Sequence, residues 1–105
     1  MNQVFELEGL VQTVAQPYRE FLRVPAMSAG LYVLPPGATD RQTPHREDEI
    51  YYVALGRGKV QIGAGEQSVS QGSIVFVEAG CEHRFFDITE QLVLVVVFAP
   101  AETTP

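Results

Sequence analysis

The chain has 105 residues, the size of one compact domain, and 46% of them are hydrophobic, so it can bury a core. Thirteen acidic residues against seven basic ones give a net charge of −6, which argues against nucleic acid or an anionic membrane as partner, because both require clustered positive charge. A single cysteine, Cys81, excludes an intrachain disulfide, and the N-terminal residues lack a signal-peptide pattern. We therefore expect one domain over residues 1–105, a cytoplasmic location and a small-molecule ligand.

The first predicted element is a short N-terminal helix. The apolar residues at positions 7, 10, 11 and 14 follow the spacing of an amphipathic helix, and Pro17 ends the pattern. We place this helix at about residues 6–15.

After Pro17 the chain alternates between short apolar runs and turn residues. About eight strands at such spacing indicate an all-β sandwich or barrel, here over about residues 18–99. Turn residues separate the runs, and the Gly-Arg-Gly of residues 56–58 is one of the predicted turns. The runs are residues 18–24, 29–34, 50–55, 59–62, 67–70, 73–77, 83–88 and 92–98.

The run at residues 92–98 is apolar at every position, without alternation. A strand of this kind needs cover on both faces. One face packs into the barrel, and the other meets the N-terminal helix or a second subunit. We therefore expect a homodimer, and cover by the helix alone is the alternative.

The only two histidines, His45 and His83, each follow a turn at the edge of a predicted strand. Glu49 lies four residues after His45 and shares a strand face with Tyr51, because side chains alternate with a period of two. That face is apolar, and a lone carboxylate is costly there unless a cation, a proton or several hydrogen bonds stabilise it. Two imidazoles and one carboxylate form the facial triad typical of non-haem iron. From spacing alone, surface or hydrogen-bonded histidines are the alternative.

The stretch GATDRQTPHREDEIYYVALG, at residues 37–56, resembles the first motif of the cupin family. Four positions of that motif are matched, namely Gly37, His45, Glu49 and Gly56. Thr43 stands where the family usually has a further histidine.

The stretch GSIVFVEAGCEHRFFD, at residues 72–87, resembles the second cupin motif. Gly72, Gly80 and His83 match, whereas Glu78 replaces a proline and Asp87 replaces an asparagine. The resemblance implies an all-β cupin jelly-roll barrel of two antiparallel sheets, with the short helix at the N-terminus, in a small single-domain cupin.

The resemblance also implies that His45, Glu49 and His83 bind a divalent metal ion. Iron, manganese, zinc, nickel and cobalt all accept this ligand set. A threonine hydroxyl is a poor ligand for such ions, so Thr43 leaves three protein ligands, and an inward turn of Gln42 is the alternative. The rest of the Arg46–Glu49 charge run is expected to be a solvated turn.

Three further residues share faces with these ligands. Tyr51 and Phe85 are expected to line the pocket, and ordinary barrel core is the alternative. Asp87 is expected to accept a hydrogen bond from a histidine ring, or else to make a turn contact.

The implied function is a metal-dependent enzyme that acts on a small organic molecule. The chemistry is that of a dioxygenase, or Lewis-acid chemistry such as isomerisation or decarboxylation, with Tyr51 and metal-bound hydroxide as the candidate bases. A small-molecule binding or sensing cupin without turnover is the alternative from another class, and a structural or interaction protein is a third.

Overall fold

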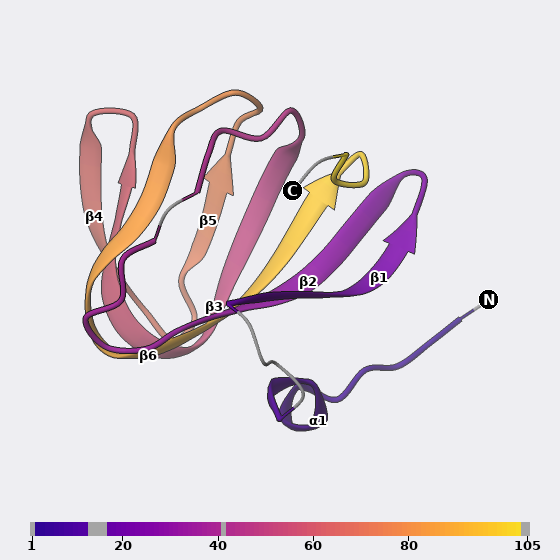
Figure 1. Cartoon of the computed structure of the whole chain (residues 1–105), viewed down its shortest axis with the longest axis horizontal. Helices are drawn as coiled ribbons and strands as arrows, with labels where there is room; N and C mark the ends of the chain where they lie inside the picture. The colour runs from indigo at the N-terminus through magenta and orange to yellow at the C-terminus, as the bar shows by residue number, and fades with distance from the viewer. Residues whose placement is uncertain (1, 13–16, 41, 104–105) are drawn as a thin grey trace.

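The computed structural model describes residues 2–12, 17–40 and 42–103. Within these residues the fold is almost entirely antiparallel β-structure, as the sequence predicts, with one short helix at the N-terminus (Figure 1). The elements are α1 (Leu7–Val11), β1 (Tyr18–Val24), β2 (Met27–Leu34), β3 (Asp48–Ile62), β4 (Gly65–Ser70), β5 (Ile74–Val77) and β6 (His83–Ala99).

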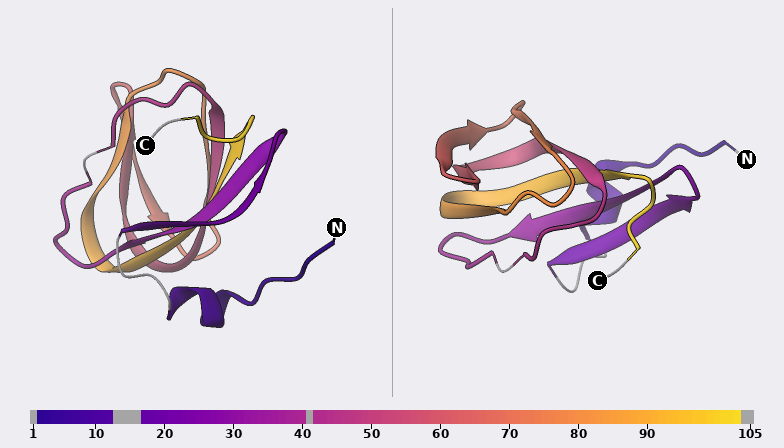
Figure 2. Two further views of the ribbon diagram at one scale, coloured as in Figure 1. Left: turned by 45° about the vertical axis from the view of Figure 1, so that its right-hand side comes forward. Right: turned by 90° about the horizontal axis from the view of Figure 1, so that it is seen from above.

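The strands form one continuous antiparallel sheet rather than two separate ones. Its order is β1-β2-β6-β3-β4, and β5 pairs with the other edge of the first part of β3. The two long strands, β3 and β6, pair along most of their length and run through both halves of the sheet, which curls into a barrel (Figure 2). The two antiparallel sheets that the cupin resemblance implies are therefore joined, because β3 and β6 run through both.

The prediction of eight strands was wrong at two places, because β3 and β6 each contain two of the expected runs. Gly56 does not lie in a turn; it has a φ of +98° and lies where the pairing of β3 with β6 shifts register. A Cβ atom at Gly56 would lie 2.0 Å from the carbonyl oxygen of Gln91. Glycine thus allows β3 to bend sharply against β6 without ending, as β-bulges do.

The barrel interior is filled by apolar side chains from inward positions of β2 to β6, and Tyr18 of β1 packs against them. β3 alternates between buried and exposed residues from Asp48 to Val53, the pattern of a strand with one face on a core. Fully buried members of this core include Val53, Val77, Phe85, Leu92 and Leu94.

Helix α1 packs on the outside of the barrel. Leu7, Leu10 and Val11 contact a small buried cluster on the outer face of the sheet that includes Leu31 and Val93. The helix thus covers part of the second face of β6. The last residues of the predicted helix, 13–15, lie outside the described residues. In the part of the chain that the structure describes, no helix has the length and apolarity needed to cross a membrane.

Part of the remaining outer face is apolar and exposed. Tyr52 of β3 lies between Val95 of β6 and Ile74 of β5, and Ile50 lies between Val97 and Phe76 in the next row. Ile50, Tyr52, Ile74 and Phe76, which we call the outer apolar patch, are each at least 43% exposed. Cover of this face by a second subunit stays a prediction.

Candidate metal centre

His45, Glu49 and His83 come from three places in the chain and meet at one end of the barrel. One ligand atom from each side chain lies within 4.8 Å of the others. His45 precedes β3, Glu49 is its second residue, and His83 is the first residue of β6. The backbone N–H of Gly80 donates to the carbonyl oxygen of His45 at 2.7 Å, which ties the loop before β6 to the loop before β3.

Hydrogen bonds on the far sides of the imidazoles decide which nitrogen of each ring faces the site. The Nδ1 of His83 is 3.0 Å from the carbonyl oxygen of Cys81, and the Nδ1 of His45 is 3.3 Å from the Oε2 of Glu102. Both oxygens accept, so each Nδ1 carries a hydrogen, and in the neutral form of each ring the Nε2 presents a lone pair. Histidines that bind metals have this arrangement, with the other ring N–H donated to a carbonyl or carboxylate.

Two acceptors lie close to the Nε2 of His83, namely Glu49 Oε1 at 3.1 Å and Gln42 Oε1 at 3.3 Å. The Tyr51 hydroxyl, 2.9 Å from the same nitrogen, donates to Gln42 Oε1. The second oxygen of Glu49, Oε2, is buried and has no hydrogen-bond partner among the described residues. Glu49 is only 2% exposed, so water does not stabilise its charge. A divalent cation fits this donor set, because it binds lone pairs of nitrogen and oxygen together.

The protonation of the buried groups follows from the same crowding. Burial lowers the pKa of His83, but the hydrogen bonds to Glu49 and to the Cys81 carbonyl outweigh it and raise this pKa overall. Burial and the charge of Glu49 raise the pKa of Tyr51 well above its usual value. Tyr51 therefore keeps its proton at neutral pH. It is a hydrogen donor at this site, whereas the sequence analysis left a role as base open.

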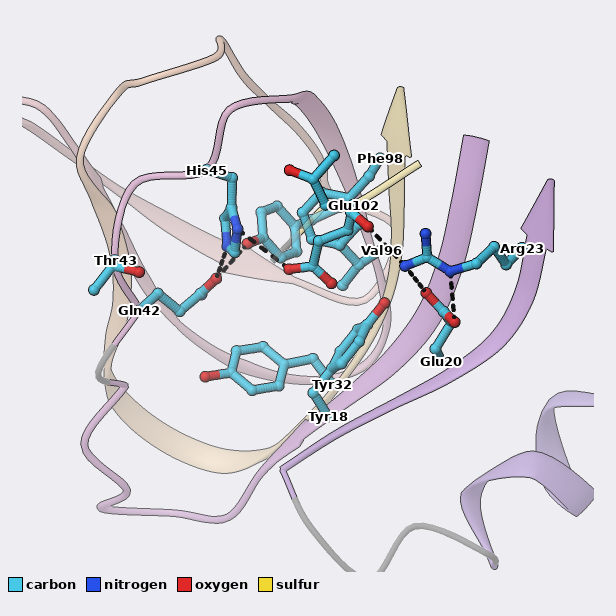
Figure 3. A pocket seen from close by; sticks show the side chains of 12 residues that line it. Tyr18, Glu20, Arg23, Tyr32, Gln42, Thr43, His45, Val96, Phe98 and Glu102 are labelled. Atoms are coloured by element: carbon cyan, nitrogen blue, oxygen red, sulfur yellow. Dashed lines mark hydrogen bonds and ion pairs between the residues drawn. The ribbon is translucent and has the colours of Figure 1, made fainter. Parts of the chain in front are cut away.

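The side chain of Gln42 turns into the site and is held there by Asp40. The Gln42 Nε2 donates to Asp40 Oδ2 at 2.8 Å, and its Oε1 lies 3.4 Å from His45 Nε2 (Figure 3). Asp40 is buried and also accepts hydrogen bonds from the Phe85 backbone N–H and from the Tyr32 hydroxyl. Asp40 was not among the predicted site residues, since nothing in the local sequence distinguishes it from a solvated loop carboxylate.

The other predicted residues lie in different surroundings. Thr43 is exposed at the rim of the cavity, and Phe85 is buried core, with its ring edge-on to Tyr51 at 5.0 Å. Asp87 is exposed and pairs with Lys59 at 3.6 Å, so it makes no contact with a histidine ring. Its φ of +47° breaks the alternation of β6, and Ile88 takes the next inward position in its place.

The C-terminal residues close one side of the site. Glu47 is buried and accepts hydrogen bonds from the Thr103 backbone and hydroxyl, at 3.2 Å and 2.7 Å. The expectation that Glu47 is solvated was therefore wrong, because a strand of the sheet continues into a segment that folds back over it. Next to Thr103, Glu102 reaches His45. Burial, together with the charge of Glu47, raises the pKa of Glu102 to about 6.

A cavity of about 470 Å³ opens from His45 toward β1 and β2. Tyr18 and Tyr32 form one wall, Phe98 lies opposite, and Arg23, paired with Glu20 at 2.8 Å, stands at the rim (Figure 3). The Tyr18 hydroxyl is buried and has no hydrogen-bond partner among the described residues. The volume lies within the roughly 300–1,000 Å³ range of small-molecule sites, and aromatic rings line it together with a few polar groups, as in such sites.

Comparison with known proteins agrees with this fold. The family model of the cupin domain matches residues 30–98, so the chain belongs to the cupin family. It is 46% identical over 86 residues to the uncharacterised protein SCO3923 of Streptomyces coelicolor, an alignment that covers 82% of each chain.

Two solved structures illustrate the similarity of fold. BH2720 from Bacillus halodurans has a TM-score of 0.82 at 21% identity, covering 100% of this chain and 85% of that one. TT1209 from Thermus thermophilus has a TM-score of 0.78 at 24% identity, covering 93% of this chain and 97% of that one. At such low identity these structures show the shared barrel alone.

Proposed function

We propose that this cupin binds a divalent metal ion through His45, Glu49 and His83 and acts on a small organic molecule held in the adjacent cavity. The observation that carries the proposal is the buried Glu49 carboxylate, which faces imidazole lone pairs and leaves Oε2 without a partner among the described residues. A proton on His83 satisfies one contact at most, whereas an ion satisfies the whole donor set.

A bound divalent ion supplies Lewis acidity toward a substrate oxygen, and iron supplies dioxygen chemistry in addition. The residues of the chain bind and orient the molecule. The aromatic wall of Tyr18 and Tyr32 takes an apolar ligand of moderate size, and the Tyr18 hydroxyl offers it a hydrogen bond.

Tyr51 is placed to donate a hydrogen bond in this chemistry. Its hydroxyl contacts both Gln42 and His83, and it lines the cavity. Because it stays protonated, it donates a hydrogen bond to a substrate oxygen that gains negative charge, which stabilises that charge. This role suits Lewis-acid chemistry and oxygenation alike.

A binding or sensing module without turnover is the second candidate function. The observation that favours it is the state of Tyr51, since a phenol with a strongly raised pKa is a poor general base. The two functions differ in whether a bound molecule is changed.

The first experiment is elemental analysis of untagged, chelator-free protein, with Glu49→Gln and a His45→Ala, His83→Ala double variant beside it. Near-stoichiometric metal in the wild type and its loss in both variants are expected. The matched control is Glu66→Gln, because Glu66 is an exposed glutamate in the β3–β4 hairpin. Metal-free wild type that also takes up no iron, manganese, zinc, nickel or cobalt on reconstitution contradicts the proposal.

The second experiment separates turnover from binding. The metal-loaded protein is incubated with a panel of small aromatic and oxygenated compounds, with and without dioxygen, and products and oxygen consumption are measured. Products that form only with metal support an enzyme, and their dependence on dioxygen distinguishes oxygenation from Lewis-acid chemistry. Saturable binding without any product supports the sensing module.

A further inference from the structure

We propose that Gln42 is a fourth protein ligand of the metal ion, bound through its amide oxygen Oε1. This inference rests on the proposed metal binding of His45, Glu49 and His83. Thr43 stands where cupins usually have a further histidine ligand, but its side chain is exposed and does not reach the site. The neighbouring residue, Gln42, reaches the site instead.

The spacing of Gln42 Oε1 from the other donors is that of ligands around one ion. It lies 3.4 Å from His45 Nε2 and 3.3 Å from His83 Nε2. Atoms bound about 2.1 Å from one ion are about 3.0–3.4 Å apart at octahedral or tetrahedral angles. His83 Nε2 and Glu49 Oε1, at 3.1 Å, have the same spacing. Gln42 therefore belongs to the same set of donors as the triad.

The orientation of the Gln42 side-chain amide is fixed by the contact of its –NH₂ group with Asp40. Gln42 Nε2 donates to Asp40 Oδ2, and a carboxylate oxygen only accepts, so the –NH₂ group must face Asp40. Asp40 itself is held by the Phe85 backbone N–H at 2.8 Å and by the Tyr32 hydroxyl. Rotation of the amide would place the Gln42 oxygen against this buried carboxylate. The arrangement therefore keeps Oε1 directed at the histidines.

Gln42 Oε1 is also undersupplied with hydrogen donors. The Tyr51 hydroxyl donates to it at 2.8 Å, but in the neutral imidazoles, the form that binds a metal ion, the two nearby Nε2 atoms present lone pairs. Three acceptors that face one another repel unless a proton or a cation lies among them. A neutral amide oxygen binds divalent ions as carbonyl oxygens do, and it adds no charge to that of Glu49.

The test is a titration of ¹⁵N-labelled wild-type protein and of the Gln42→Leu variant with Zn²⁺. The two side-chain N–H signals that disappear in Gln42→Leu identify the Gln42 amide. We expect these signals to shift in the wild type up to one equivalent of Zn²⁺, while the Gln67 amide, on the exposed strand β4, does not move. Zn²⁺ affinity, measured by chelator competition, is expected to fall at least about tenfold in Gln42→Leu, because loss of even an indirect partner of a ligand costs about 10–100-fold.

Gln67→Leu is the matched control, and its affinity should equal that of the wild type. Restoration of tight binding by Gln42→His, which offers a different donor at the same place, supports ligation over a packing role. Stoichiometric Zn²⁺ binding with unshifted Gln42 signals and unchanged affinity in Gln42→Leu overturns this inference and leaves the triad standing. Failure of the wild type to bind Zn²⁺, Mn²⁺ or Co²⁺ overturns the proposed metal binding itself, and with it the role of Gln42.

Discussion

The buried carboxylate of Asp40 accepts a hydrogen bond from the side-chain amide of Gln42 at 2.8 Å, and this contact directs the amide oxygen toward both histidines. Asp40 thereby joins the core, through the backbone of Phe85, to the candidate metal centre. Through this carboxylate the side chain of Gln42 is tied to the first part of β6.

Asp40→Asn should weaken metal binding and destabilise the fold. The Gln42 amide and the Phe85 N–H both donate to Oδ2, and the Tyr32 hydroxyl donates to Oδ1. An asparagine keeps its oxygen toward the first two donors and turns its –NH₂ group to the Tyr32 hydroxyl, so hydrogen bonds to a charged carboxylate are replaced by weaker ones to a neutral amide. We expect a loss of about 1–3 kcal/mol in the free energy of unfolding, measured by urea denaturation. Metal affinity should fall as well, because a neutral amide holds the Gln42 side chain less firmly than a carboxylate does. Asp87→Asn, at an exposed carboxylate, is the control and should change neither quantity. Equal stability of both variants would show that Asp40 is not the anchor described above.

Tyr51→Phe should separate chemistry from metal binding. The ring and its edge-on contact with Phe85 are kept, while the hydroxyl next to Gln42 and His83 is lost. Metal content should stay near that of the wild type, and turnover of an identified substrate should fall about 10²–10³-fold, the cost of losing one well-placed donor. Tyr52→Phe removes an exposed hydroxyl on the outer face and should leave turnover unchanged. Full activity of Tyr51→Phe would exclude the hydrogen-bond-donor role.

Glu102→Gln should lower metal affinity through His45. The carboxylate accepts from His45 Nδ1 at 3.3 Å and keeps Nε2 directed at the site. An amide at this place holds the ring less firmly, and a loss of about 10–100-fold in affinity is expected from metal competition assays. Glu90→Gln, which alters an exposed ion pair with Arg57, is the matched control and should leave metal affinity unchanged. If both variants bind metal equally well, the C-terminal segment only covers the site.

Gly30→Ala should disrupt the wall of the cavity. The ring of Tyr18 lies across Gly30, and an added Cβ would be 2.4 Å from the ring and hydroxyl. Displacement of the ring should cost about 1–3 kcal/mol in thermal or urea unfolding and should impair ligand binding. Gly9→Ala is the contrast, because a Cβ there meets nothing within 4 Å and alanine favours helix α1 by up to about 1 kcal/mol. Unchanged ligand binding in Gly30→Ala would mean that Tyr18 does not shape the site.

Substitution in the outer apolar patch should test the predicted homodimer. Four exposed apolar side chains on adjacent strands, next to the part of β6 that α1 leaves uncovered, favour packing against a second copy of the same face. We expect a dimer in sedimentation velocity for the wild type and a monomer for an Ile74→Lys, Phe76→Glu variant. Val4→Glu changes an exposed valine away from the sheet and should stay dimeric. A wild type that sediments as a monomer at high concentration contradicts this prediction.

Local sequence determined the composition of the site to a large extent. The period of two along β3 places Glu49 and Tyr51 on the same inward face, and this follows from strand geometry without knowledge of the fold. The two cupin-like motifs placed His45 and His83 beside them, and the structure brings these side chains together. The strands β1 and β5 also lie close to their predicted ranges, since each is bounded by turn residues.

Only the tertiary structure decided how this site is oriented and enclosed. Asp40 meets the Phe85 backbone, and Glu102 meets His45, across 45 and 57 residues of chain respectively, as their numbering gives. The bends of β3 at Gly56 and of β6 at Asp87 arise from the pairing of these two strands, so local sequence indicates a turn at Gly56 and gives no sign of the break in alternation at Asp87. Periodicity reports which face a residue occupies, because it depends on backbone geometry alone. Which partner a side chain meets on that face depends on segments remote in the sequence, and those contacts exist only once the barrel has closed.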